Sequence, residues 1–417
     1  MPTAYIVEAL RTARAQRGGA RREWRSADLG AAVLNALVTR SRIDPGQIED
    51  VIVGCVSQVG EQSFQIGRNM VLASSPSDSV PAVSIDRQCG SSQQALHFAA
   101  QAVMSGTQYV VIAAGIEHMT RVPMGLPTLL AANARLGTGP WPRSILGRYG
   151  VDQFSQFTGA EMIARNYGFS RDALGKFALA SHRKAIAATE AGAFEREIVV
   201  LDGLDKEGGN FRHATDEAIR RDASTDALAG LKTLVPTGVV TAGQVCDGAS
   251  AVLVVSEAAL KAHGLTPIAR VKALAVTADD AVIMLMEPIP ATRRLLNCAG
   301  RRIDEIDLFE ENEAFAPVPL AWLKELGADP EKLNVNGGAI ALGHPLGASG
   351  TKFSLKCLPP TVSSIDRPLP HDQYPPMAPR RPPARPTDRR WRPRARYCPD
   401  WRSRARADVA QDPLAGV

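Results

Sequence analysis

Residues 86–95 read DRQCGSSQQA and lie between two segments that are typical of strands. Residues 83–85 form the first, and the apolar run YVVIAA at residues 109–114 is typical of a strand covered on both faces. Between them the pattern predicts a helix over residues 91–105, which Gly106 ends. The stretch therefore indicates a strand–helix–strand unit of an α/β protein.

The chain before this unit predicts two more strands and a helix. We expect strands at residues 4–8 and 50–56, because both segments are apolar and rich in β-branched residues. A helix is predicted between them with Ser26 as its N-cap, since three apolar residues are spaced for one helix face: Leu29, Val33 and Leu37. The first half of the chain thus alternates strands with helices.

The second half repeats this order of elements. Strands are predicted at residues 269–276, 306–309 and 333–335. Helices are predicted at residues 288–299 and 313–326, and a glycine loop at 337–350 leads into a last helix that reaches residue 358. The two halves therefore indicate one strand–helix design used twice.

A long insertion, residues 116–243, separates the two halves. Residues 124–144 have loop-like composition, whereas residues 159–167 and 170–192 predict helices. Ser170 is a natural N-cap, and Gly192 is a natural stop. An insertion of this size usually builds a binding site or an oligomer contact.

Composition excludes several classes of protein. The chain has 417 residues, 45% of them hydrophobic and 22% charged, and no run of eighteen apolar residues that would span a membrane. Its six cysteines form no CxxC pair, so we expect reduced thiols and neither a disulfide framework nor a metal site. The N-terminus has no secretory pattern, and a cytoplasmic location is expected.

The last 59 residues, 359–417, differ from the rest in composition. They hold 12 Arg, 6 Asp and 13 of the 29 prolines, so they carry a charge of +6 while the remainder carries −1. Such a sequence cannot bury a core and predicts a disordered tail. A basic tail can bind nucleic acid. We favour a solvated extension, because the segment carries no signature of a nucleic-acid-binding module.

Cys89 stands where a predicted strand turns into a helix. The helix N-terminus favours a thiolate there, and small neighbours (Gly90, Ser91 and Ser92) let a carbonyl approach the sulfur and the backbone N–H groups. This is the arrangement for acyl transfer through a thioester. Burial in a core is the commoner role of a single cysteine, but the small polar neighbours favour a nucleophile.

His344 lies within a glycine-rich loop, Asn334–Gly350, which reads NVNGGAIALGHPLGASG. Glycines on both sides let the backbone turn tightly beside a ligand, which favours a catalytic over a structural histidine. The loop is not a phosphate-binding P-loop, because Thr351 and not lysine follows Gly350.

Asn312 opens a third polar stretch, NEAFA, at residues 312–316. The stretch closes a predicted strand and opens a predicted helix. Asn312 is therefore a candidate to hold a water or a carbonyl oxygen, or to cap the helix, and both roles are compatible.

From residue 4 to about residue 351 the chain resembles the thiolases, which are acyl-CoA acyltransferases. Four motifs in the same order carry the resemblance: DRQCGSSQQA (86–95), GIEHM (115–119), NEAFA (312–316) and the glycine loop (334–350). The resemblance implies a duplicated βαβαβαββ fold in five layers, coenzyme A thioester substrates, no bound cofactor, a role in lipid metabolism such as β-oxidation, and a homodimer or homotetramer.

The resemblance also implies roles for individual residues. Cys89 is the acylated nucleophile, and His344 activates it and contributes, with a water held by Asn312, to an oxyanion hole. Ala314, Phe315 and Gly343 are expected to contact coenzyme A. The expected domains are an N-terminal domain (1–265, including the insertion), a truncated C-terminal domain (266–358) and the tail (359–417).

Two other classes of enzyme remain as alternatives. Cys89, Asn312 and His344 also supply the residue types of a papain-type cysteine hydrolase, but Ser92 and Gln93 stand where that family has Cys-Trp. Condensing enzymes of polyketide and fatty-acid synthesis share the thiolase fold, but they have a histidine where this chain has Asn312.

The chain departs from the thiolases after the glycine loop. These enzymes carry a second reactive cysteine, in Cys-x-Gly, about thirty residues beyond the loop histidine, and nothing near Tyr374 matches it. Neither Cys357 nor Cys398 is followed by x-Gly. The departure removes an expected acid/base and oxyanion donors, so we expect an impaired thiolase or an inactive acyl-CoA-binding protein.

Overall fold

The computed structural model of the chain describes residues 2–76, 78–137, 139–241, 243 and 245–356. The Pro/Arg-rich segment 359–417, for which disorder is predicted, lies outside the described residues. No described helix is long and apolar enough to cross a membrane.

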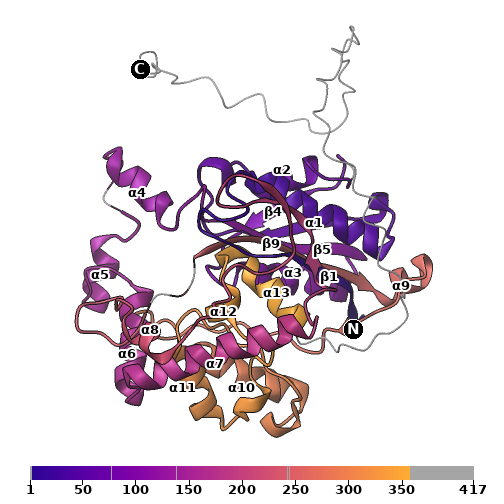
Figure 1. The fold of residues 1–417 in the computed structure, drawn as a ribbon. Helices are drawn as coiled ribbons and strands as arrows, with labels where there is room; N and C mark the ends of the chain where they lie inside the picture. Colours follow the sequence, from indigo (N-terminus) through magenta and orange to yellow (C-terminus); the bar gives the residue numbers. More distant parts are fainter. Residues whose placement is uncertain (1, 77, 138, 242, 244, 357–417) are drawn as a thin grey trace, which may run out of the picture. The chain divides into compact units, whose positions relative to one another are not determined.

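A mixed sheet forms the centre of the described chain (Figure 1), and its strand order is β10-β1-β9-β5-β3-β4. Strand β5 runs antiparallel to β9, from Val110 opposite Val255 to His118 opposite Asp247, and parallel to β3. Two short strands, β2 and β6, pair with β9 and β1. The strands are β1 (Ala4–Thr12), β2 (Ala15–Gln16), β3 (Asp50–Gly54), β4 (Ala82–Ile85), β5 (Val110–His118), β6 (Ile198–Val199), β9 (Cys246–Ser256) and β10 (Ala269–Arg270).

Helices cover both faces of this sheet, as Figure 1 shows. Every residue of β5 and β9 is buried, because successive side chains point to opposite faces and both faces are packed. Ile112 and Leu253 pack with α1 and α2, whereas Val111 and Val252 pack with α3. The helices are α1 (Ser26–Ser41), α2 (Ile66–Leu72) and α3 (Ser91–Ser105), and α13 (Ser349–Lys356) lies beside α3.

The strand–helix–strand unit around Cys89 is confirmed. Helix α3 has the predicted bounds, and Gly106 ends it with a left-handed φ of 76°. The prediction of Ser26 as an N-cap is wrong. Arg25 is the N-cap of α1, and Ser26 is the first helical residue, whose buried hydroxyl donates to Gln62 Oε1 at 3.3 Å.

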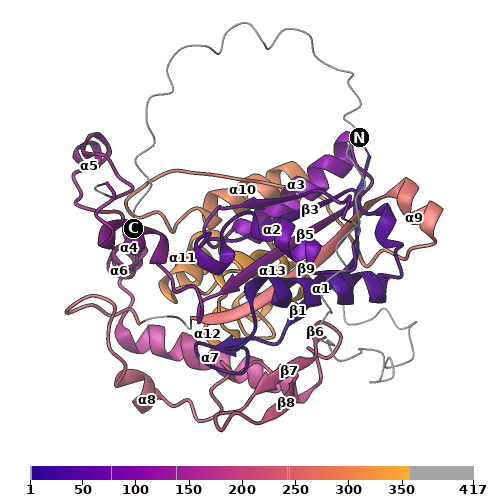
Figure 2. The same cartoon turned by 90° about the horizontal axis from the view of Figure 1, so that it is seen from above.

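The insertion is more helical than its sequence suggests, since α4 and the first two residues of α5 lie where a loop is predicted over residues 124–144. The capping predictions are confirmed: Ser170 Oγ accepts from Ala173 N, and Gly192 follows the end of α7 with a φ of 70°. Figure 2 shows α6, α7 and α8 grouped on the side of the sheet away from α9. The elements are α4 (Leu126–Asn133), α5 (Arg143–Tyr149), α6 (Gln156–Tyr167), α7 (Arg171–Glu190), β7 (Leu201–Leu204), β8 (Asn210–His213), α8 (Thr225–Ala229) and α9 (Glu257–His263).

The second half has the predicted helices but not the predicted strands. The helix predicted over residues 288–299 is confirmed, whereas the one expected from residue 313 begins only at Pro317. Of the strands predicted at 269–276, 306–309 and 333–335, the described residues form only β10 and an isolated parallel bridge between Phe309 and Leu333. The helices are α10 (Pro288–Ala299), α11 (Pro317–Leu326) and α12 (Ala339–Leu342).

The order of the first sheet explains why these strand predictions are wrong. Strands β1 and β3 do not pair with each other, because β9 and β5 lie between them. Strand β5 follows α3 in the sequence, and by analogy the corresponding central strand of the second half would follow α13. The sequence there reads Leu358-Pro359-Pro360, and proline cannot donate to a central ladder. In the described part of the second half, strand pairing is limited to β10 and to the bridge between Phe309 and Leu333, which matches the parallel β3–β4 pairing.

Candidate active site

Cys89 lies in a tight turn between β4 and α3. Gln88 has a left-handed φ of 48°, and Ser91 fixes the turn: its hydroxyl accepts from Arg87 N (2.9 Å) and donates to the Gln88 carbonyl (2.6 Å). A non-glycine residue in this region of φ is sparsely populated and recurs at functional sites. The turn presents a half-buried Cys89 at the start of the helix.

The thiol of Cys89 is protonated at neutral pH. Burial raises the pKa of Cys89 to about 12, and the negative charges of Glu117 and Asp86 add to this effect. The expected preference for a thiolate at the helix N-terminus is therefore outweighed by burial. Nucleophilic chemistry at Cys89 requires a base to remove the thiol proton.

His344 is buried and held through both ring nitrogens. Ser349 Oγ donates to the Pro345 carbonyl (2.9 Å), so it accepts from Nδ1–H of His344 at 2.6 Å. This leaves the Nε2 lone pair facing Asn312 Nδ2 at 3.4 Å. Burial, with help from Arg14 and Lys352, lowers the pKa of His344 to about 3. The imidazole is therefore neutral, and Nε2 is the ring nitrogen that can accept a proton.

Asn312 lies beside His344, with its Nδ2 at 3.4 Å from His344 Nε2, but it does not cap a helix. The N-cap of α11 is Ala316, so the capping interpretation is wrong. Asn312 Oδ1 is buried and has no hydrogen-bond partner among the described residues. A buried amide oxygen of this kind is suited to bind a water or a substrate donor.

The glycine loop that carries His344 packs directly on the first turn of α3, the helix that Cys89 precedes. Thr351 N donates to Ser92 Oγ at 3.1 Å. A Cβ at Gly350 would overlap the backbone nitrogen of Gln93. Only glycine permits such a close approach of two backbones.

Glu117, in the GIEHM motif, holds this arrangement together. Its fully buried carboxylate accepts from Val56 N (3.0 Å), Ser57 N (3.1 Å), Gln62 Nε2 (3.0 Å) and Gly347 N (2.9 Å). Burial raises the pKa of Glu117, and the donors oppose that shift. Sequence reasoning did not single out this residue, although a carboxylate within an apolar strand was a visible signal.

Glu313 holds the NEAFA stretch in place in the same way, and sequence reasoning did not single it out either. Its buried carboxylate accepts from Ser181 Oγ (2.6 Å), Asn334 Nδ2 (2.7 Å) and Ile340 N (3.2 Å). These bonds join α7, the glycine loop and the segment that carries Asn312. A Cβ at Gly338 would overlap the carboxyl group of Glu313, so the contact requires glycine there.

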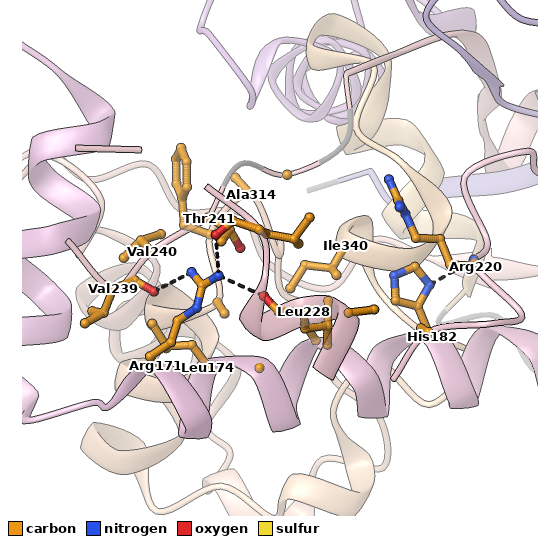
Figure 3. Close-up of a pocket in the computed structure, with 18 of the residues that line it drawn as sticks. Arg171, Leu174, His182, Arg220, Leu228, Val239, Val240, Thr241, Ala314 and Ile340 are labelled. Atoms are coloured by element: carbon orange, nitrogen blue, oxygen red, sulfur yellow. Dashed lines mark hydrogen bonds between the residues drawn. The ribbon is translucent and has the colours of Figure 1, made fainter. Parts of the chain in front are cut away.

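A pocket with a volume of about 130 Å³ lies between α7, α8 and the segment after Asn312 (Figure 3). Its lining includes Ala314 and Phe315, which are expected to contact coenzyme A, together with Arg171, His182 and Arg220. Arg171 donates to the carbonyls of Val239 (3.1 Å), Leu228 (2.8 Å) and Leu231 (2.9 Å), and His182 Nδ1 accepts from Arg220 N (3.2 Å).

Gly343, which is also expected to contact coenzyme A, does not line this pocket and lies against Cys246. Another glycine, Gly243, does line the pocket. Burial and the charge of Arg220 lower the pKa of His182 to about 4, so this imidazole is neutral. The described residues include no cluster of three or more His, Cys, Asp or Glu side chains that could hold a metal ion.

The chain belongs to the thiolase family. The family model for "Thiolase, N-terminal domain" matches residues 4–258, and that for "Thiolase, C-terminal domain" matches residues 265–361. The mixed α/β fold described above is thus that of thiolase N- and C-terminal domains, and the chain is a thiolase-type acyltransferase. Membership sets aside the cysteine hydrolase and the condensing enzymes as classes for this chain.

Three relatives narrow the class further. The chain is 48% identical over 359 residues to the steroid 3-ketoacyl-CoA thiolase FadA6 of Mycobacterium tuberculosis. The aligned region covers 85% of this chain and 86% of the relative. It is 42% identical over 368 residues to 3-ketoacyl-CoA thiolases of Aeromonas hydrophila and Yersinia pestis, over 86% of this chain and 92% of each relative. By family and relatives, its activity is that of a 3-ketoacyl-CoA thiolase.

Proposed function

We propose that this chain cleaves or forms 3-ketoacyl-CoA through an acyl thioester on Cys89. One observation carries the proposal: a glycine loop with a neutral, buried His344 packs on the first turn of the helix that Cys89 precedes. A protonated thiol and a neutral imidazole in one site form an acid–base pair.

In the cleavage direction, His344 Nε2 takes the proton from Cys89, and the sulfur attacks the 3-keto carbon of the substrate. The bond between C2 and C3 then breaks, which leaves the acyl group on Cys89, and acetyl-CoA is released once its carbanion takes up the proton that His344 removed from the thiol. The thiol of a second coenzyme A attacks the thioester and regenerates Cys89. A water held by Asn312, together with His344, stabilises the negative oxygen of the tetrahedral intermediate.

Coenzyme A binds in the pocket between α7 and α8. The exposed Arg220 and the nearby Arg171 supply positive charge for its phosphates, and Ala314 and Phe315 flank the pantetheine arm, which leads toward Asn312. Gly343 contacts the thioester end. The name of the mycobacterial relative suggests bulky polycyclic acyl groups, which a panel of steroid side-chain and straight-chain 3-ketoacyl-CoA substrates would test.

The step that protonates or deprotonates the α-carbon is expected to be slow in this chain. No Cys-x-Gly follows His344, and a positioned acid/base contributes about 10²–10⁴-fold. Under this proposal the second half of the duplicated five-layer fold is also incomplete, because the sequence after α13 has no apolar segments typical of strands.

The protein is further proposed to be cytoplasmic and to form a homodimer or homotetramer. Strand β4 lies at the edge of the sheet, and exposed apolar side chains lie on it and near it: Val83 is 39% exposed and Phe64 is 93% exposed. Light scattering on the purified protein measures the assembly, and a monomer at micromolar concentration would contradict this part.

The test is coenzyme A-dependent release of acetyl-CoA from 3-ketoacyl-CoA. It compares the natural chain, the Cys89→Ala variant and a chimaera in which a 3-ketoacyl-CoA thiolase ending with Cys-x-Gly replaces the residues after Lys356. We expect the chimaera to be roughly 10²-fold faster than the natural chain and Cys89→Ala to be inactive.

Equal rates for the natural chain and the chimaera would show that the natural sequence after Lys356 does not impair the reaction. Acyl-CoA binding without turnover in both would favour an inactive binding protein, and hydrolysis of amides independent of coenzyme A would favour a cysteine hydrolase.

A further inference from the structure

Arg14 is a buried arginine whose side chain reaches the active-site loop from the far side. It follows strand β1, is only 2% exposed, and its Nη1 donates to the carbonyl oxygen of Gly343. That carbonyl belongs to the peptide unit that joins Gly343 to His344. The peptide group is planar, so holding its oxygen fixes the plane from which the His344 side chain projects.

The backbone of Arg14 is itself firmly anchored. Its N–H donates to Asp216 Oδ1 at 2.8 Å, and both oxygens of Asp216 accept from the guanidinium of Arg11 at 2.7 and 2.9 Å. Arg11 also pairs with Glu197 at 2.5 Å. The single charge of Arg11 offsets one of these two carboxylate charges, and both carboxylates also help to keep Arg14 charged.

Gly343 is held from a second side as well. It has a left-handed φ of 84°, and a Cβ at this position would lie 2.8 Å from Cys246 Sγ. A side chain at this position would therefore collide with β9, and the bond from Arg14 holds the Gly343 carbonyl. Burial lowers the pKa of Arg14 to about 10, so its guanidinium is charged at neutral pH.

We propose that Arg14 is a positioning residue for the acyl-transfer reaction: it orients His344 through the Gly343 carbonyl. The inference rests on the proposed role of His344 as the base for Cys89. A buried positive charge disfavours a second one beside it, so Arg14 favours neutral His344.

Several other charged or titratable groups face the loop and would still act on it if Arg14 were replaced. Lys352 on α13 also disfavours the imidazolium, so part of the effect remains without Arg14. The carboxylate of Glu117 on β5 bonds to Gly347 N, and the thiol of Cys246 on β9 is protonated because burial raises its pKa to about 12. None of these groups replaces the bond to the Gly343 carbonyl.

The test compares Arg14→Met and Arg14→Lys with Arg21→Met as the matched control. Arg21 is equally buried and donates to the carbonyls of Asp202 (2.6 Å) and His213 (3.4 Å), so its loss also removes a buried charge and backbone contacts. Acylation of Cys89 by acyl-CoA is followed by mass spectrometry between pH 4 and 9, and thermal unfolding reports the folded fraction of each variant.

We expect Arg14→Met to acylate Cys89 about 10²-fold more slowly at pH 7 and to lose rate as the pH falls toward an imidazole pKa below about 6.5. Arg14→Lys, which keeps the charge and a donor, restores most of the rate and the flat profile. Arg21→Met changes thermal stability but leaves the pH profile of the folded protein unchanged.

The proposal is overturned if folded Arg14→Met keeps the natural rate and profile, or if Arg14→Lys is as impaired as Arg14→Met while folded. If Arg14→Met does not fold, the Lys variant decides alone: a flat profile at near-natural rate supports the proposal, and a shifted profile contradicts it. Acylation that persists in Cys89→Ala or is unaffected in His344→Ala would instead overturn the proposed function.

Discussion

At the scale of single residues, the site pairs a protonated thiol with a neutral imidazole. Because the pKa of His344 is about 3, this base stays neutral from pH 8 down to pH 5, and acylation of Cys89 should not fall over that range on its account. We expect His344→Ala to acylate about 10²–10⁴-fold more slowly at pH 7. The rate of the variant should then rise with pH toward the thiol pKa of about 12. Stopped-flow acylation across pH checks this, and a variant within tenfold of the natural rate with an unchanged profile would refute the role of His344.

The residues that sequence reasoning found and those that it missed differ in where their partners lie. Cys89 and His344 are recognisable because their own neighbours in the chain, small residues and glycines, indicate close approach of a ligand. Glu117 and Glu313 were missed, since their roles depend on donors such as Gly347 and Ser181 that are distant in the sequence. The expected thiolate at Cys89 was wrong for a related reason: burial is a property of the packed fold and not of the helix terminus alone.

At the scale of elements, the contact of the glycine loop with α3 is the one that brings the site together. A Cβ at Gly350 would overlap the backbone nitrogen of Gln93, which cannot move without shifting the first turn of α3. We expect Gly350→Ala to lower the free energy of unfolding by roughly 1–3 kcal/mol and to slow acylation of Cys89. Gly147→Ala is the matched control, because Gly147 lies in α5 with open space around it, so alanine should be neutral or slightly stabilising there. Denaturant titration measures both, and equal effects of the two substitutions would contradict the packing described.

Helices were predicted more accurately than strands, and the reason is physical. The predicted bounds of α3 and α10 match those observed because helix ends are set by local residues such as Gly106 and Gly300, both left-handed C-caps. A strand needs a partner that can lie far away in the sequence. Residues 269–276 have the composition of a strand, yet within the described residues only Ala269 and Arg270 form one, where they pair with β1.

At the scale of the whole molecule, buried carboxyl groups make the stability of the fold depend on pH. Burial, together with the charges of Glu310 and Glu313, raises the pKa of Glu311 to about 8. A folded state that holds this proton more tightly than the unfolded state is most stable below pH 4.5 with respect to this group, and it loses that contribution as the pH rises through 8. We expect Glu311→Gln to reduce the loss of unfolding free energy between pH 5 and pH 8.5 by roughly 1–2 kcal/mol. Urea titrations at several pH values measure the effect. An identical pH dependence of the unfolding free energy in the natural protein and the variant would contradict the raised pKa of Glu311.

The central claim is that the acyl group passes through Cys89, and capture of the intermediate tests it most directly. The protein is mixed with 3-ketoacyl-CoA in the absence of free coenzyme A, quenched in acid and analysed by intact and peptide mass spectrometry. We predict a mass increase equal to the substrate acyl group shortened by two carbons, confined to the peptide that contains Cys89, absent from Cys89→Ala and removed when coenzyme A is added. An adduct on Cys55, Cys246 or Cys298 with Cys89 unmodified, or turnover by the Cys89→Ala variant, would contradict the account.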